Sequence, residues 1–254
     1  MLEIVQLPIL EDNYIYLIHD PESGETAAVD PGLAQPVLDI LSQKKWQLTY
    51  IFNTHHHWDH VDGNLELKQK TGCKIIAGQG DYHRIPGIDS GVNDGDTLRL
   101  GNHQVGIIAT PGHTLNHIVY YFAEQQKLFC GDTLFVMGCG RLFEGTAEQM
   151  WQSLQKLKAL PPATQFYCTH EYTQTNGQFA LTVEPDNVQL QQRMRTVKQL
   201  RANHQPTVPS TIAQELATNP FFREDSASLQ QTIGMMNKLP VQIFAEIRRL
   251  KDSF

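Results

Sequence analysis

The residues best suited to chemistry in this sequence are histidines and aspartates that gather in one short stretch. Residues 54–60 read THHHWDH and include the potential metal ligands His55, His57, Asp59 and His60. In an extended backbone, side chains two residues apart point to the same side, so His55 and His57 can bind one ion. The turn that follows can direct Asp59 and His60 toward a second ion. The stretch therefore predicts a site for two metal ions.

Three more candidate ligands follow apolar runs at later turns: His113 after TPG, Asp132 after CG and His170 after CT. Strand ends in layered α/β folds commonly converge at one edge, where ligand sites form. Imidazole and carboxylate ligands suit zinc, iron or manganese better than calcium. A lone histidine is more often an ordinary surface or core residue, and Asp132 alone is more often a turn former. The joint occurrence of all these residues favours the metal site.

The elements that must position these residues change along the chain. Short runs rich in β-branched and aromatic residues predict strands at 14–19, 26–29, 50–53, 73–77, 105–109, 117–122 and 127–130. Helical spacing predicts helices at 36–45, 63–70 and 146–160, the last beginning at a Thr146 cap. Strands with interspersed helices predict a layered α/β domain.

Beyond Glu171 the pattern becomes helical, with helices expected at 187–203, 211–218 and 241–251. A chain of 254 residues with 41% hydrophobic content can bury one substantial core and a smaller second unit. We expect a catalytic domain over residues 1–172 and a helical domain over residues 173–254.

Charge and composition narrow the functional classes. The net charge of −7, from 20 Lys and Arg against 27 Asp and Glu, opposes non-specific nucleic-acid binding. No run approaches the roughly 20 apolar residues of a membrane span, and the first residues lack the features of a signal peptide. The cysteines lie far apart without a CxxC pair, so we expect free thiols rather than disulfides or a thiolate zinc site. These features predict a cytoplasmic protein that binds neither nucleic acid nor membrane, and we expect it to be a monomer.

The THHHWDH stretch resembles the THxHxDH signature of the metallo-β-lactamase superfamily, and the later candidates match its remaining ligand positions in order. The resemblance implies an αββα sandwich, here with a smaller C-terminal α-helical domain, and two divalent metal ions per chain. It implies that His55, His57 and His113 hold one ion, that Asp59, His60 and His170 hold the other, and that Asp132 bridges them. Zinc is the expected metal, with iron and manganese as alternatives.

Other segments resemble the glyoxalase II family over nearly the whole chain. They are EDNY at 11–14, DPG at 30–32, GCGRLFEGT at 138–146, HEYT at 170–173, VEP at 183–185, NPF at 219–221 and RRLKDSF at 248–254. This resemblance implies hydrolysis of S-D-lactoylglutathione to D-lactate and glutathione, a step of methylglyoxal detoxification. A related hydrolase acting on another thioester or ester is the alternative.

In that family the helical domain helps to bind glutathione, and the matching residues here are Arg141, Phe143, Tyr172, Arg248 and Lys251. Cations can bind the two carboxylates of glutathione. Cations in the last turn of a helix also complement its dipole, which is the alternative interpretation of Arg248 and Lys251. Many relatives carry Lys in place of Arg141 and Tyr in place of Phe143. The lost hydroxyl weakens binding by about 0.5 to 1.5 kcal/mol.

The expected nucleophile is solvent. A bound metal lowers the pKa of water from about 15.7 to near 7, and two ions roughly 3.5 to 4 Å apart can share the resulting hydroxide. We expect this bridging hydroxide to attack the thioester carbonyl, with Asp59 and Asp132 as the catalytic carboxylates that orient it. Cys139 is the rival nucleophile, but no partner histidine is evident and a buried thiol is usually inert.

Two further classes carry the same kind of metal motif. A metallo-nuclease is opposed by the acidic balance of the chain and by the lack of a basic, aromatic-rich stretch. A redox module like the flavo-diiron proteins would have a carboxylate near the position of His57 and a flavin domain. This chain has neither.

Overall fold

The computed structural model describes all 254 residues, and its first sheet contains the first six strands in chain order. The edge strand β1 (Glu3–Ile9) is antiparallel to β2 (Asn13–His19), and β2 is antiparallel to β3 (Glu25–Val29). The remaining pairs are parallel and add β4 (Gln47–Phe52), β5 (Lys74–Gly78) and β6 (Ser90–Val92). Crossovers between the parallel strands leave their carboxyl ends at one edge, where β4 delivers the histidine-rich loop.

A second layer is an antiparallel meander of β7 (Thr97–Leu100), β8 (His103–Ala109), β9 (Ile118–Phe122) and β10 (Lys127–Gly131). Aromatic side chains join the two layers. The rings of Phe52 and Tyr120 stack with centroids 4.8 Å apart, and the Tyr120 hydroxyl is hydrogen-bonded to the carbonyl oxygens of Asn53 and Ile76 at 2.9 Å. The phenol is thus buried with its polar end satisfied, as a close-packed interior requires.

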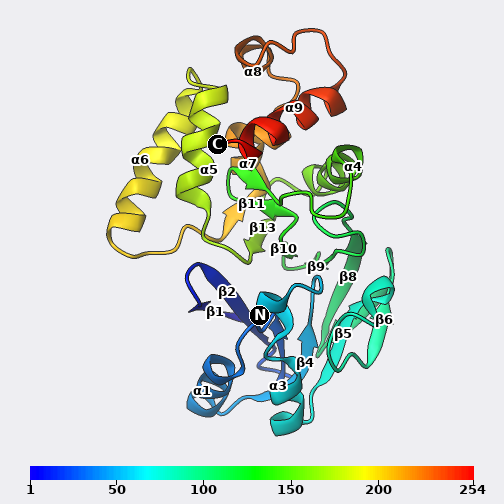
Figure 1. Ribbon diagram of the computed structural model, residues 1–254. Helices are drawn as coiled ribbons and strands as arrows, with labels where there is room; N and C mark the ends of the chain where they lie inside the picture. Colours follow the sequence, from blue (N-terminus) through cyan, green and yellow to red (C-terminus); the bar gives the residue numbers. More distant parts are fainter. The chain divides into compact units, whose positions relative to one another are not determined.

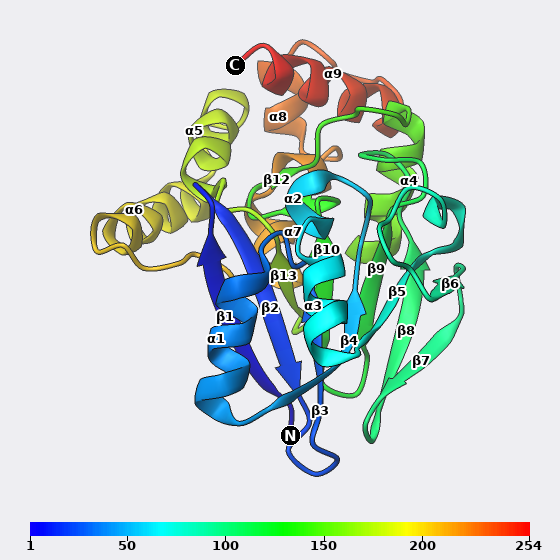
Figure 2. The ribbon, with the colours of Figure 1, turned by 60° about the horizontal axis from the view of Figure 1, so that its bottom comes forward.

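Helices cover the other face of the first sheet (Figure 2). They are α1 (Ala34–Lys44), the short α2 (Trp58–Val61) and α3 (Asn64–Thr71), and a 3-10 turn follows at Gln79–Asp81. Val37 of α1 and Leu67 of α3 are fully buried in one cluster with Leu17 and Ile51 of the sheet. This shared cluster anchors α1 and α3 to the sheet whose strand β4 leads into the loop that contains residues 53–57.

The chain divides into two compact units: residues 1–109 with 116–131, and residues 110–115 with 132–254. The second unit contains the hairpin β11 (Leu134–Phe135) and β12 (Gly138–Cys139), the antiparallel pair β13 (Gln165–Cys168) and β14 (Ser210–Thr211), and the helix α4 (Ala147–Lys158). Its C-terminal helices are labelled in Figure 1: α5 (Thr173–Val183), α6 (Val188–Ala202), α7 (Ile212–Thr218), α8 (Ala227–Thr232) and α9 (Pro240–Asp252), with a 3-10 turn at Pro220–Phe222.

The elements agree with the sequence analysis where the patterns were strong. Thr146 caps α4 in a full capping box, because its side chain accepts from the backbone N–H of Gln149. The strand β1 was not predicted; it contains Pro8 and is an edge strand that pairs only with β2. The helix α5 was not predicted either, because its Gly177 disfavours a helix on local propensity. No helix is long and apolar enough to cross a bilayer.

Candidate metal centre

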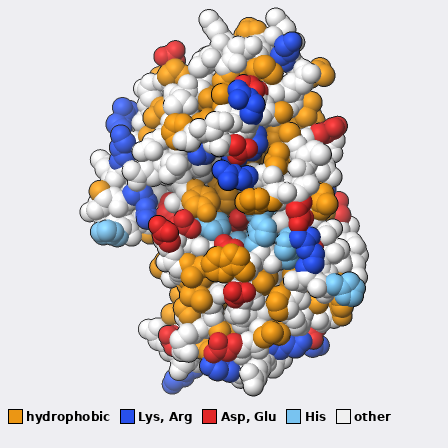
Figure 3. Space-filling model, viewed as in Figure 1, with side chains coloured by type: hydrophobic (Ala, Val, Ile, Leu, Met, Phe, Trp, Pro, Cys, Tyr) orange, Lys and Arg blue, Asp and Glu red, His pale blue; other side chains and the backbone are white.

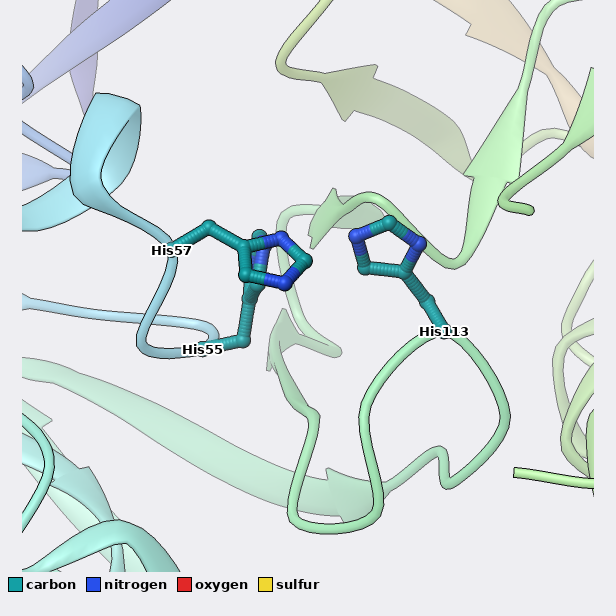
Figure 4. Close-up of side chains that lie close together, drawn as sticks. All are labelled: His55, His57 and His113. Atoms are coloured by element: carbon teal, nitrogen blue, oxygen red, sulfur yellow. The ribbon is translucent and has the colours of Figure 1, made fainter. Parts of the chain in front are cut away.

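The first unit carries the histidine-rich loop directly after β4. His55 and His57 leave this loop with their rings close together (Figure 4), and His55 Nε2 lies 3.0 Å from His57 Nδ1. His55 is 1% exposed. These two nitrogen donors therefore lie close together, although the backbone at Thr54 and His55 forms a bend and is not extended as expected.

Asp59 and His60 form a second donor pair in the same unit, in the single turn of α2. Their Oδ2 and Nε2 atoms are 3.4 Å apart. Asn13 donates from its side-chain amide to Asp59 Oδ2 at 2.9 Å, which restricts the carboxylate to one orientation. The turn thus separates this pair from the His55 and His57 pair along the chain.

Asp30, which was not predicted as a site residue, holds the histidine-rich loop through hydrogen bonds. Its carboxylate accepts from the backbone N–H of Thr54 at 2.7 Å and from the Thr54 hydroxyl at 2.6 Å. Its Oδ2 also lies 3.2 Å from His60 Nδ1, which leaves His60 Nε2 to face Asp59. The donor atoms of Asp30, His55 and His60 all lie within 4.8 Å of one another. A carboxylate behind a histidine in this way is a typical outer support of a metal ligand.

His117 is a second residue that the sequence analysis did not assign to the site. It is fully buried just before β9, and its ring stacks on His55 with centroids 4.9 Å apart. The available signal was its position at the start of an expected strand, in the segment TPGHTLNH at 110–117. A histidine there was indistinguishable from an ordinary strand residue, because its neighbour His55 is remote in sequence.

The second unit gathers its three candidate ligands around one carboxylate. Asp132 Oδ2 lies 3.4 Å from His113 Nε2 and 3.4 Å from His170 Nε2. The other oxygen, Oδ1, accepts from the Thr169 hydroxyl at 2.5 Å. All three candidate ligands are at most 6% exposed. Asp132 therefore presents one oxygen to two histidines while the other is held by the fold.

His113 lies on a loop (Figure 4) and is oriented by the chain that follows Asp132. Its Nδ1 is 2.8 Å from the carbonyl oxygen of Arg141, a partner that can only accept, so Nδ1 carries the proton and Nε2 has the free lone pair. Gly140 allows the loop 138–146 to lie against the backbone of Asp132, because a Cβ at that position would lie 2.0 Å from the carbonyl oxygen of Asp132. The loop 138–146 thus sets the tautomer of a candidate ligand.

Three of the predicted glutathione-binding residues lie beside these histidines in the second unit. The ring of Phe143 is edge-on to His113 with centroids 5.2 Å apart, and Tyr172 stacks on His170 at 4.7 Å with nearly parallel planes. Phe143 is 61% exposed, and the Arg141 side chain is also exposed, with its Nε 3.5 Å from Asp252 Oδ1. Two aromatic rings and one cation are therefore available to a molecule that binds beside these histidines.

The other two predicted glutathione-binding residues are packed into α9. Arg248 is 6% exposed, donates to the carbonyl oxygen of Cys139 at 2.9 Å and is paired with Asp252 Oδ1 at 2.8 Å. Lys251 places its ammonium near the rings of Phe179 and Phe254, and burial lowers its pKa. Arg248 thus connects α9 to β12, the strand that precedes Arg141.

Cys139 is buried beside Arg248, and burial raises the pKa of its thiol to about 11 although the neighbouring guanidinium acts in the opposite direction. A thiol with this pKa is protonated at neutral pH and is a poor nucleophile. The structure therefore gives no support to covalent catalysis by Cys139.

The donor sets of the two units fit divalent transition metals. Imidazole nitrogens and carboxylate oxygens form pairs in the first unit and a triad in the second, and no thiolate is among them. Zinc, iron and manganese accept such ligands, whereas calcium prefers oxygen alone. Several buried imidazoles face one another, as His55 and His60 do with ring centroids 4.1 Å apart, which is an arrangement with little structural use unless a metal binds there.

Two protein-family models match the chain and together cover almost all of it. The metallo-beta-lactamase superfamily model matches residues 10–170, and the model described as hydroxyacylglutathione hydrolase C-terminus matches residues 171–254. The first match contains all the candidate metal ligands, and the second contains the C-terminal helices from α5 onward.

Individual relatives show the same similarity over their full length. The chain is 54% identical over 254 residues to a hydroxyacylglutathione hydrolase of Methylococcus capsulatus, covering 100% of this chain and 99% of the relative. It is 53% identical to one of Rhodospirillum rubrum with the same coverage. Among solved structures, ETHE1 from Myxococcus xanthus superposes with a TM-score of 0.68 at 25% identity, covering 95% of this chain and 94% of that one.

Proposed function

This chain belongs to the hydroxyacylglutathione hydrolases of the metallo-β-lactamase superfamily, and from that membership we propose that it hydrolyses S-D-lactoylglutathione to D-lactate and glutathione. The observation that carries the proposal is the Asp132 carboxylate oxygen placed 3.4 Å from both His113 and His170 in the unit that also presents Arg141, Phe143 and Tyr172. Metal donors and groups suited to a peptide thioester are thereby combined.

We propose that two divalent metal ions bind here, with zinc expected and iron or manganese as alternatives. His55, His57 and His113 would hold one ion, Asp59, His60 and His170 the other, and Asp132 both. Bound there, the ions would supply a water of lowered pKa and an electrophile for the thioester carbonyl.

The contribution of the chain is to hold these donors in fixed states. The carbonyl oxygen of Arg141 keeps the proton of His113 on Nδ1, and the Asp30 carboxylate lies 3.2 Å from Nδ1 of His60. Asn13 and Thr169 each hold one carboxylate, that of Asp59 and that of Asp132 respectively. We propose that these two carboxylates orient the attacking water, because the partners leave each with one fixed orientation.

The substrate is proposed to lie over the aromatic rings beside the histidines. The Arg141 guanidinium is exposed and can form paired hydrogen bonds with a glutathione carboxylate. Phe143 and Tyr172 offer apolar faces to the tripeptide. Arg248 and Lys251 would act from the helical domain, proposed to span residues 173–254 and to follow a catalytic domain of residues 1–172.

The decisive experiment pairs elemental analysis of the purified protein with steady-state kinetics on S-D-lactoylglutathione and on simple acyl thioesters. We expect metal ions to be present and kcat/KM to fall strongly when the tripeptide is trimmed. Equal kcat/KM for the trimmed thioesters would favour the alternative, a related hydrolase of another thioester or ester. A protein that binds no metal and hydrolyses neither substrate contradicts the proposal.

We further propose a monomer in the cytoplasm that binds a small-molecule thioester and neither nucleic acid nor membrane. All four cysteines are free and buried, which suits a reducing compartment. On the face in Figure 3, Lys and Arg lie among Asp and Glu and form no continuous basic surface. Sedimentation of the purified protein tests the monomer, and a salt-dependent shift with RNA would contradict the absence of nucleic-acid binding.

A further inference from the structure

His56 stands between two candidate metal ligands and is held by residues outside the ligand loop. Its Nδ1 lies 3.3 Å from Asp81 Oδ2, and the Arg84 guanidinium contacts its Nε2. Since a guanidinium can only donate, Nε2 accepts and Nδ1 carries the proton that faces Asp81. The ring of His56 is thereby fixed in tautomer and direction.

Asp81 is the centre of this arrangement. Its side chain is 1% exposed, and its Oδ1 accepts from the side-chain amide of Asn116 at 2.8 Å and lies 3.4 Å from Arg84 Nη1. Asn116 precedes His117 and follows the loop of His113 by three residues. One buried carboxylate therefore joins the ligand loop to the segment that enters β9.

The local packing leaves little freedom for this junction. A Cβ at Gly80 would lie 2.2 Å from the side-chain oxygen of Asn116, so the backbone beside Asp81 approaches Asn116 as closely as glycine allows. The backbone N–H groups of Arg84 and Ile85 donate to the carbonyl oxygen of Asp81 at 2.8 and 3.1 Å. Asp81 is thus held from both its main chain and its side chain.

We propose that Asp81 is a positioning residue for metal binding, which acts through His56 on the backbone that carries His55 and His57. A buried carboxylate is costly unless it is paired, and here the pairing converges on the residue between two ligands. This inference rests on the proposed function, because it assumes that His55 and His57 bind metal. Substitution of a residue that hydrogen-bonds to a metal ligand typically lowers metal affinity or activity by about 10- to 100-fold.

The test follows the rate at which zinc-loaded protein transfers zinc to a chromogenic chelator, with the melting temperature as a second measurement. Asp81→Ala and His56→Ala are expected to release zinc about 10- to 100-fold faster than the unmodified protein. His56→Asn places an amide donor where Nδ1 stood and is expected to restore most of the retention. Asp81→Asn keeps the shape of the side chain and an oxygen that can accept from Asn116. It replaces Asp81→Ala in the measurement if Asp81→Ala does not fold.

Asp20→Ala is the matched control. Asp20 is also a buried carboxylate of the first unit, and it accepts from the backbone N–H groups of Glu22 and Asn102 at 3.1 Å, in turns away from the ligand loop. It should lower the melting temperature and leave zinc release unchanged. Release at the normal rate from the Asp81 variants, or equally fast release from Asp20→Ala, overturns the inference. Failure of the unmodified protein to bind zinc would instead contradict the proposed function.

Discussion

The two units carry different arrangements of candidate metal ligands. In the first unit, His55, His57, Asp59 and His60 come from one loop and one helical turn, and a buried Asp30 supports them from the neighbouring strand end. In the second unit the donors come from three separate segments and meet at a single oxygen of Asp132.

Candidate metal ligands lie in both units, whereas the residues predicted to recognise the substrate lie in the second unit alone. The local donors of the first unit are surrounded by supports such as Asp30 and Asn13, and none of the residues predicted to contact glutathione belongs to that unit. The second unit carries His113 and His170 with aromatic rings packed against both. We therefore expect changes in the first unit to alter metal content, and changes around the second to alter KM as well.

The largest effect is expected at the meeting point of the second unit. Asp132→Ala should reduce kcat to background and lower the metal content, because one oxygen faces both His113 and His170. The loss should exceed the roughly 10- to 100-fold that a supporting residue costs. Steady-state kinetics with elemental analysis checks this. A variant with full metal content and ordinary turnover would show that Asp132 is not needed for metal binding or catalysis.

The next effect tests the support of the first unit. Asp30→Ala removes the acceptor that holds Thr54 and the buried carboxylate that lies 3.2 Å from His60 Nδ1, so both the loop and the His60 ring lose a support. We expect metal affinity to fall about 10- to 100-fold, with KM changed much less than metal content. Titration of the metal-free protein with zinc measures the affinity. A rise in KM with unchanged metal affinity would contradict the expectation that changes in the first unit alter metal content.

A smaller effect sharpens the role of the second unit. Phe143→Tyr adds a hydroxyl to an exposed ring beside His113, and a new hydrogen bond of about 0.5 to 1.5 kcal/mol would lower KM by roughly 2- to 10-fold. Tyr172→Phe should have the opposite sign if its hydroxyl contacts substrate. Measured kcat should stay near that of the unmodified enzyme, as expected for uniform binding. An unchanged KM in both variants would place glutathione elsewhere.

The smallest effect is expected at Cys139. Burial raises the pKa of this thiol to about 11, so it stays protonated through the neutral range and gains nucleophilicity only as the pH rises toward that value. Cys139→Ala should keep most of the turnover and the same dependence of kcat on pH between about 6 and 9. Loss of activity with retained metal would revive covalent catalysis.

Much of the fold followed from local patterns. Alternation and apolar runs predicted β2, β3, β4, β5 and three of the meander strands, β8, β9 and β10, and helical spacing with its cap predicted α4. The patterns failed where tertiary contacts outweigh propensity. Pro8 is tolerated because β1 is an edge strand, and Gly177 is tolerated inside α5 because that helix packs on α6.

The sequence by itself determined the types of the donor residues and the family, because THHHWDH and its followers are a dense and specific pattern along the chain. Only the tertiary structure decided which residues support the donors. Asp30, Asp81 and His117 act on partners 24 to 62 positions away, such as Thr54, His56 and His55. Burial and hydrogen bonding between remote segments depend on packing, and no local spacing encodes them.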